Sequence, residues 1–239
     1  MATGPDQPPS VWTRPPKKAP TLTRELIVAT AIRVLDAEGL EALSMRRLGA
    51  ELKTAATAFY WHVGGKDELI ELVVDQVYGE IDIPVLDDPA DWRTAAAACA
   101  RSLRAAILRH PWFASLTAET GLAFLGPQLM EKTDHMIGIL EDAGFTLEEA
   151  DLALSTLVSW VTGASIVEAA WRNTLARKQL DEQDWMQRVW PLAVQAVQPY
   201  PRLRRLYATQ SDAHGGPRED AFDYGLRRIL AGMEPTPES

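Results

Sequence analysis

The chain has 239 residues, 46% of them hydrophobic, which is enough to bury a core and excludes a disordered tail. Its single cysteine, Cys99, excludes an internal disulfide framework, and its four histidines lie too far apart in sequence for a zinc site, so we expect neither metal nor cofactor. No apolar run reaches the roughly 18 residues of a membrane helix and no apolar signal-peptide core is present, so we expect a cytoplasmic protein without membrane contact.

The charge is distributed unevenly along the chain, whose formal net charge is −9. Residues 10–66 carry nine Lys or Arg against five acidic residues, whereas residues 67–239 carry 15 basic against 27 acidic residues. A basic segment on an acidic body favours phosphate binding at one place with little stray binding elsewhere. The alternative interpretation is chance variation among surface charges.

Residues 1–20 are rich in proline and predict an unstructured basic arm. Arg14, Lys17 and Lys18 lie near Trp12 in this arm. Such an arm could enter a DNA minor groove, or it could be a disordered leader without a partner. The sequence leaves both interpretations open.

Three short helices are predicted after the arm. Thr23 is a good N-cap for the first helix, which ends at Gly39. Ser44 caps the second helix, which breaks near Lys53, and a third helix covers residues 56–62. Two short helices joined by a tight turn predict a helix-turn-helix unit.

Four ring-bearing residues follow one another in the third helix: Phe59, Tyr60, Trp61 and His62. Successive helical positions are about 100° apart, so these four side chains cannot all face one core. Some of Tyr60, Trp61 and His62 must point outward, either to a partner or into a contact between this unit and the rest of the chain.

Arg46 and Arg47 stand in the first turn of the second helix. The unpaired N–H groups of a helix N-terminus attract anions, and the two arginines add charge and reach. This arrangement predicts phosphate binding.

The remaining chain is predicted to be all-α, with a connecting helix over residues 67–83 and a helical domain over 84–239. Asp91 is the predicted cap of the first body helix, and Thr146 with Glu149 forms a capping box for a later one. The predicted body helices cover residues 91–109, 112–119, 121–143, 146–173, 181–197, 201–210 and 218–232, with a flexible break at Gly215 and Gly216.

Aromatic, methionine, histidine and serine side chains of the body predict a largely apolar ligand pocket between helices. The candidates are Trp112, Phe113, Phe124, Met130, His135, Met136, Ser159, Trp160 and Trp171. The alternative is that these side chains belong to the core, as we expect for Cys99.

The small hydroxyl residues near the apolar face of helix 146–173 have three possible roles. Ser155, Ser159, Thr162 and Ser165 could bond to their own helix, reach a ligand, or let helices approach closely at a dimer interface around Gly163.

Residues 22–81 resemble the TetR family of bacterial transcriptional repressors. The resemblance is carried by the segment AEGLEALSMRRLGAEL, by the run TAFYWHVGGKDEL and by Lys66 at the start of the next helix. It implies a helix-turn-helix DNA-binding domain over residues 21–66 and a ligand-binding and dimerisation domain over 84–239. The implied function is a homodimeric repressor that binds a palindromic double-stranded operator and is released by a small, largely apolar effector.

The resemblance also implies roles for individual residues. Arg46 matches the base-reading arginine, whose guanidinium can bridge guanine O6 and N7. Tyr60 and Lys66 match phosphate-binding positions. The positions near base edges or backbone are Thr57, Ala58, Trp61 and His62, and Phe59 matches a core position.

Two departures from the family pattern concern the turn and the helix that follows it. Lys53 occupies a turn position that is often glycine, so the turn either avoids a positive φ or is slightly strained. Ala55 and Ala56 offer no side-chain hydrogen bonds, so contact with thymine methyl groups is expected to matter.

Two other functions are compatible with an exposed aromatic run on an all-α chain. A non-regulatory adaptor would use the aromatic residues on a protein partner, and an enzyme would act on a small apolar substrate. The sequence shows no nucleophile with a base, no paired carboxylates and no phosphate loop, so we do not expect an enzyme.

Overall fold

The computed structural model describes residues 22–120, 126–211 and 219–236, and within these ranges it contains helices and no strands. The predicted all-α class is confirmed. The elements are α1 (Arg24–Glu38), η1 (Leu40–Ala42), α2 (Met45–Leu52), η2 (Ala56–Trp61), α3 (Lys66–Tyr78), η3 (Pro89–Asp91), α4 (Trp92–Arg109), α5 (Phe113–Thr120), α6 (Pro127–Asp142), α7 (Leu147–Lys178), α8 (Glu182–Ala196), α9 (Pro201–Ser211) and α10 (Glu219–Gly232).

Some predictions concern residues outside the described ranges. They are the basic arm over residues 1–20, the pocket candidate Phe124, and the break at Gly215 and Gly216.

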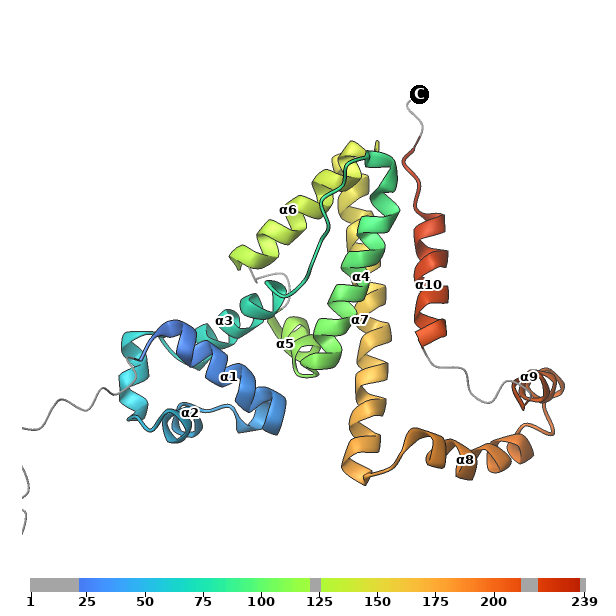
Figure 1. Cartoon of the computed structure of the whole chain (residues 1–239), viewed down its shortest axis with the longest axis horizontal. Coiled ribbons are helices and arrows are strands. Elements are labelled where there is room, and N and C mark those ends of the chain that lie inside the picture. The colour runs from blue at the N-terminus through green and yellow to red at the C-terminus, as the bar shows by residue number, and fades with distance from the viewer. Residues whose placement is uncertain (1–21, 121–125, 212–218, 237–239) are drawn as a thin grey trace, which may run out of the picture.

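The N-terminal elements form a small head, which comprises α1, α2, η2 and the start of α3 (Figure 1). Thr23 Oγ1 accepts a hydrogen bond from the Leu26 N–H at 3.2 Å, and Ser44 Oγ accepts one from the Arg47 N–H at 3.1 Å. Both predicted caps are therefore confirmed. The third helix is a 3₁₀ helix over six residues, and Ala55 at its start has no side chain that could cap an α-helix.

The connection between head and body differs from the prediction. The helix α3 ends at Tyr78, so the connecting helix predicted over residues 67–83 is too long. Ile81 and Ile83 are buried and Asp82 between them is exposed, an alternation that belongs to extended chain. The Asp82 N–H donates to Ser102 Oγ at 2.8 Å, which holds this extended segment against α4.

Two helix ends in the body also differ from the prediction. The side chain of Asp91 does not cap α4; instead Asp88 accepts from the Ala90 N–H at 2.8 Å and caps η3. The helix α7 continues beyond residue 173 to Lys178. The sequence predicts a helix boundary where a strong capping residue is present. It does not fix the end of a helix that lacks a glycine or proline stop.

The body is built around α7, which packs against α4, α6 and α10 (Figure 1). Its start carries the predicted capping box between Thr146 and Glu149. By length and composition alone α7 could cross a membrane. Its packing against three other helices favours a place in a helical bundle. One continuous cluster of buried residues joins the head to this bundle.

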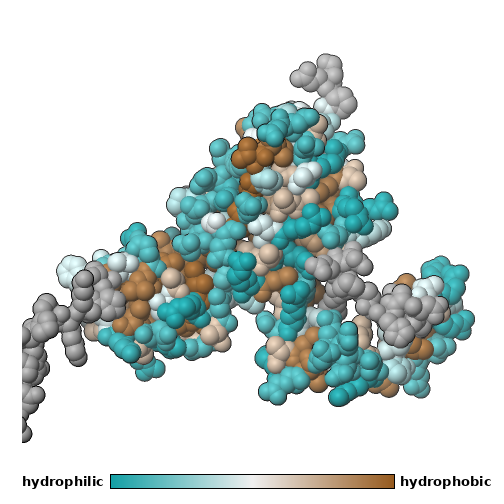
Figure 2. Space-filling view, in the orientation of Figure 1, coloured by the Kyte–Doolittle hydropathy of each residue, from teal (hydrophilic) through white to brown (hydrophobic). Residues whose placement is uncertain are grey.

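The helices α8 and α9 extend from the end of α7 away from the bundle (Figure 1). Trp185 packs edge-on against Trp171 with centroids 4.5 Å apart, and Trp190 stacks on Tyr207 at 5.1 Å. No residue of α8 is buried, and large apolar side chains such as Leu192 and Leu206 are exposed. Figure 2 shows apolar surface on these projecting helices.

Candidate nucleic-acid interface and internal cavity

The aromatic run on η2 divides into one buried and two exposed side chains. Phe59 is 0% exposed and fixes η2 to the core of the head, whereas Tyr60 is 59% and Trp61 is 89% exposed. Thr57 is also exposed, and Ala58 and His62 are half-buried. An almost fully exposed tryptophan has no stabilising role in an isolated head, so it is a candidate contact for a partner.

The turn before η2 has a positive φ at Lys53, which is the slightly strained alternative of the two given by the sequence. Lys53 has φ 52° and ψ 41°, in the left-handed region. The turn then packs on Gly49, where a Cβ atom would lie 2.9 Å from the Thr54 carbonyl oxygen. The glycine on which this tight helix-turn-helix depends therefore lies within α2, before the turn.

The two arginines of α2 have different surroundings. Arg47 donates to Glu38 Oε1 at 2.6 Å and to Glu51 Oε2 at 2.8 Å. Hydrogen bonds from Arg47 lower the pKa of both carboxyl groups, so its charge is compensated within the head. Arg46 is exposed and, within the described part of the chain, forms no ion pair, so its charge is available to a partner.

The segment between η2 and α3 is held by hydrogen bonds. Glu68 accepts from the Gly64 N–H at 2.6 Å, and Arg24 Nε donates to the His62 carbonyl oxygen at 3.1 Å. These bonds position Lys66, which is exposed in the first turn of α3. Exposed aromatic, arginine and lysine side chains thus come from three consecutive elements of one small head.

The head meets the body through a polar junction around two buried rings, which the sequence did not indicate. His110 is 3% exposed; its Nδ1 lies 2.7 Å from Asp36 Oδ1 in α1, and its Nε2 lies 3.3 Å from Glu80 Oε2. The Trp112 indole N–H donates to the same Asp36 oxygen at 2.7 Å. One carboxylate of the head therefore holds two buried rings at the α4–α5 corner of the body.

We expect Asp36→Ala to lower the free energy of unfolding by about 1–3 kcal/mol, because the buried His110 ring and the buried Trp112 N–H lose their acceptor. Urea unfolding of the full chain measures this loss. Glu41→Ala removes an exposed carboxylate of η1 and serves as the control, with an expected change within about 0.5 kcal/mol. Equal unfolding free energies for the two variants would contradict the proposed importance of the junction.

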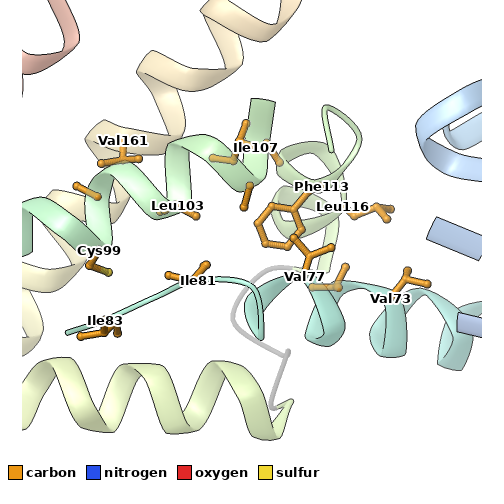
Figure 3. Close-up of a cluster of buried hydrophobic side chains, with 14 of the residues drawn as sticks. Val73, Val77, Ile81, Ile83, Cys99, Leu103, Ile107, Phe113, Leu116 and Val161 are labelled. Carbon is orange, nitrogen blue, oxygen red and sulfur yellow. The ribbon is translucent and has the colours of Figure 1, made fainter. Parts of the chain in front are cut away.

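A cavity of about 230 Å³ lies between the extended segment after α3 and the helices α4, α6 and α7. Figure 3 shows part of its wall, where Ile81, Ile83, Cys99, Leu103, Ile107 and Phe113 lie close together. Its polar lining residues are Lys132, Thr133, Asp151, Ser155 and Thr162. An apolar cavity with a few polar groups is typical of a small-molecule site.

The structure places only some of the predicted pocket residues at this cavity. Phe113 and Met136 line it. Trp112 lies instead at the head–body junction, because its indole N–H finds an acceptor there. The others do not line it within the described residues: Trp160 packs on Phe222, Trp171 packs on Trp185, Met130 and Ser159 are exposed, and His135 is half-buried.

Sequence reasoning missed Lys132, Thr133 and Asp151 as lining residues. It noted Ser155 and Thr162 on α7 as residues that could reach a ligand, and both line the cavity. Their spacing of seven residues puts them on one face of α7, which was the available signal.

A helix-turn-helix head with exposed aromatic and basic side chains, joined to a helical bundle with a cavity, defines a DNA-binding regulator. The profile described as "Bacterial regulatory proteins, tetR family" matches residues 27–73, and that described as "Tetracyclin repressor-like, C-terminal domain" matches residues 84–236. The chain belongs to the tetR family of transcriptional regulators, as its sequence suggested. Members of this family are DNA-binding proteins and not enzymes.

Individual relatives agree with this assignment. An HTH-type transcriptional regulator of Saccharopolyspora erythraea is 34% identical over 232 residues, which cover 96% of this chain and 93% of the relative. The HTH-type transcriptional repressor DrrR1 of Streptomyces coeruleorubidus is 34% identical, over 90% of this chain and 78% of its own. Among solved structures, Streptomyces coelicolor ActR in complex with actinorhodin has 31% sequence identity to this chain. The match covers 89% of this chain and 96% of the ActR chain, with a TM-score of 0.71.

Proposed function

We propose that this protein is a homodimeric repressor in the bacterial cytoplasm that binds a palindromic operator and is released by a small, largely apolar effector. The observation that carries the proposal is the division of η2 into the buried Phe59 and the exposed Tyr60 and Trp61. The name of the relative DrrR1 supports repression. The complex of ActR with actinorhodin supports the response to a ligand.

In the proposed complex the recognition segment η2 enters the major groove. Arg46 reads a base, and Thr57, Ala58, Trp61 and His62 contact base edges or backbone. Tyr60 and Lys66 bind phosphate and set the orientation. We assign Arg47 a positioning role beside these residues, because its guanidinium is held between Glu38 and Glu51.

Two substitutions in the head test these assignments. We expect Lys66→Ala to weaken binding to all operator sequences and to reduce the salt slope of the binding constant by about 1, because one phosphate contact is lost. We expect Arg46→Ala to relax base preference at one position of each half-site, by about 1–3 kcal/mol. Gel-shift titrations at several salt concentrations measure the first effect, and selection from randomised operators measures the second.

The matched control is Lys178→Ala at the C-terminal end of α7, which removes the same charge far from the head along the chain. Its affinity should equal that of the native protein. An unchanged salt slope for Lys66→Ala, or an unchanged preferred site for Arg46→Ala, would refute the corresponding role.

The second copy of the dimer is proposed to cover an exposed face of α7. Leu152, Ser159, Gly163 and Ile166 are exposed at successive spacings of seven, four and three residues and therefore lie on one side of this helix. Small residues among apolar ones allow two helices to approach closely, as in a helical bundle. In the simplest arrangement the dimer presents two recognition segments about 34–36 Å apart, which matches one turn of DNA.

The cavity beside α4, α6 and α7 is the proposed effector site. Its walls adjoin the head–body junction: Phe113 follows Trp112 in the chain, and Tyr78 precedes Glu80 by two residues. The rings of Tyr78 and Phe113 are in edge contact, 5.1 Å apart. A ligand that moves either ring would shift the groups that hold Asp36, with a coupling of about 1–3 kcal/mol expected between the two sites.

A further inference from the structure

The positive charge at the proposed effector cavity comes from Lys132 of α6. Among the described residues that line the cavity, Lys132 is the only basic one. It is half-buried and forms no ion pair with any residue of the described ranges. An ammonium group beside an apolar cavity without a carboxylate partner is unfavourable unless water or a ligand compensates its charge.

Lys132 and the Cys99 thiol line the same cavity, from α6 and from α4. Burial raises the pKa of Cys99 to about 11, and the charge of Lys132 acts in the opposite direction on the same thiol. Cys99 is 8% exposed and lines the cavity from α4. Asp151, the acidic lining residue, is exposed on α7. The cavity therefore has a positive charge on its α6 side, from Lys132, and a negative charge on its α7 side, from Asp151.

The rest of the lining is suited to a ring. Phe113 and Met136 are buried in the wall, and aromatic and thioether side chains make favourable contacts with aromatic ligands. Burial also raises the pKa of Tyr78 in the same wall, so this aromatic side of the cavity lies away from solvent.

We propose that the effector is a small aromatic acid, whose rings lie against Phe113 and Met136 and whose anionic group pairs with Lys132. The proposal rests on the proposed function, because it names the ligand class of the same cavity. Thr133, next to Lys132, and Thr162, on the facing helix α7, supply hydroxyl groups that orient the acid. Asp151 repels an anion, so the acid enters with its charged group towards Lys132.

Two fluorescent probes with the same rings test this inference on the full-length protein: anilinonaphthalene sulfonate, which is an anion, and the neutral phenylnaphthylamine. We expect Lys132→Gln to weaken binding of the sulfonate at least about tenfold, since a charged hydrogen-bond partner is lost. Lys132→Arg retains most of the affinity. The neutral probe binds equally to all three proteins.

Two kinds of control accompany the probes. Lys178→Gln changes the net charge by the same amount at the end of α7 and leaves the binding of both probes unchanged. Thr162→Phe and Thr133→Phe fill the cavity from α7 and from α6, and both probes then lose affinity. Far-ultraviolet circular dichroism checks that each variant keeps its helices.

The possible failures are distinguishable. If Lys132→Gln leaves the sulfonate affinity unchanged while both filled variants exclude both probes, the cavity binds ligands but does not select an acid, and only the present inference is overturned. If the filled variants bind both probes as tightly as the native protein, the cavity is not the ligand site. That result overturns the inference together with the effector site in the proposed function.

Discussion

Phe59→Ala should unfold the head while the helical body remains folded. The ring is 0% exposed and joins η2 to the core of the head, and truncation of a buried phenylalanine costs about 3–5 kcal/mol. A small domain has little stability in excess of such a loss. Operator binding should disappear, and circular dichroism in the absence of denaturant should show a loss of helical signal that corresponds to the head.

The adjacent residue provides the control for this experiment. Tyr60 is 59% exposed on the same η2, so Tyr60→Ala should leave the unfolding curve unchanged within about 0.5 kcal/mol while it weakens operator binding. The two variants thus separate a fold defect from a contact defect. Operator binding that survives Phe59→Ala would contradict the role of η2 as the recognition segment.

Glu168→Ala should destabilise the body by about 3–5 kcal/mol, because it leaves a largely buried arginine without its partner. Glu168 accepts two hydrogen bonds from Arg104, both at 2.9 Å, and the two side chains are 13% and 12% exposed. The Arg104 guanidinium also lies 4.7 Å from the Phe222 ring centroid, so one ion pair ties α4, α7 and α10 together. Urea unfolding of the full-length protein at fixed concentration measures the loss.

Two comparisons sharpen this prediction. The double variant Arg104→Met with Glu168→Leu removes both charges and should recover much of the lost stability. Asp223→Ala breaks the more exposed pair with Arg101, whose side chain is 54% exposed, and should cost at most about 1 kcal/mol. A loss at Glu168 no larger than that at Asp223 would show that the buried position of the pair is unimportant.

The head could be predicted from the sequence because its signals are local. Thr23 and Ser44 are capping residues at the starts of periodic segments, and both caps are present. The aromatic run predicted that some of its rings are buried and others exposed, and in the structure Phe59 is buried and Trp61 is exposed. The ion pair of Arg47 with Glu38 was not predictable, because Glu38 lies on another helix. The pair with Glu51 has the four-residue spacing of neighbours on one helix.

The cavity could be predicted only as a class of site, because its lining depends on which helices meet. Trp112 and Met136 both look like core residues of predicted helices in the sequence. In the structure the Trp112 N–H bonds to the head, whereas Met136 lines the cavity. Lys132 looks like an ordinary surface lysine in the sequence. That Lys132 lines the cavity follows only from the folded structure, where it shares the lining with Cys99, which is 33 positions earlier in the chain and on another helix.

At the left-handed turn, Lys53 lowers the stability of the head through its conformation and adds a positive charge to the surface. A residue with a Cβ atom loses roughly 1–2 kcal/mol in this conformation, and glycine does not. Glycine at this position would therefore raise the heat tolerance of the head, but it would also remove a cation from the basic segment that faces DNA in the proposed complex. The native lysine is consistent with a head selected for its electrostatic attraction to the operator ahead of maximal resistance to unfolding.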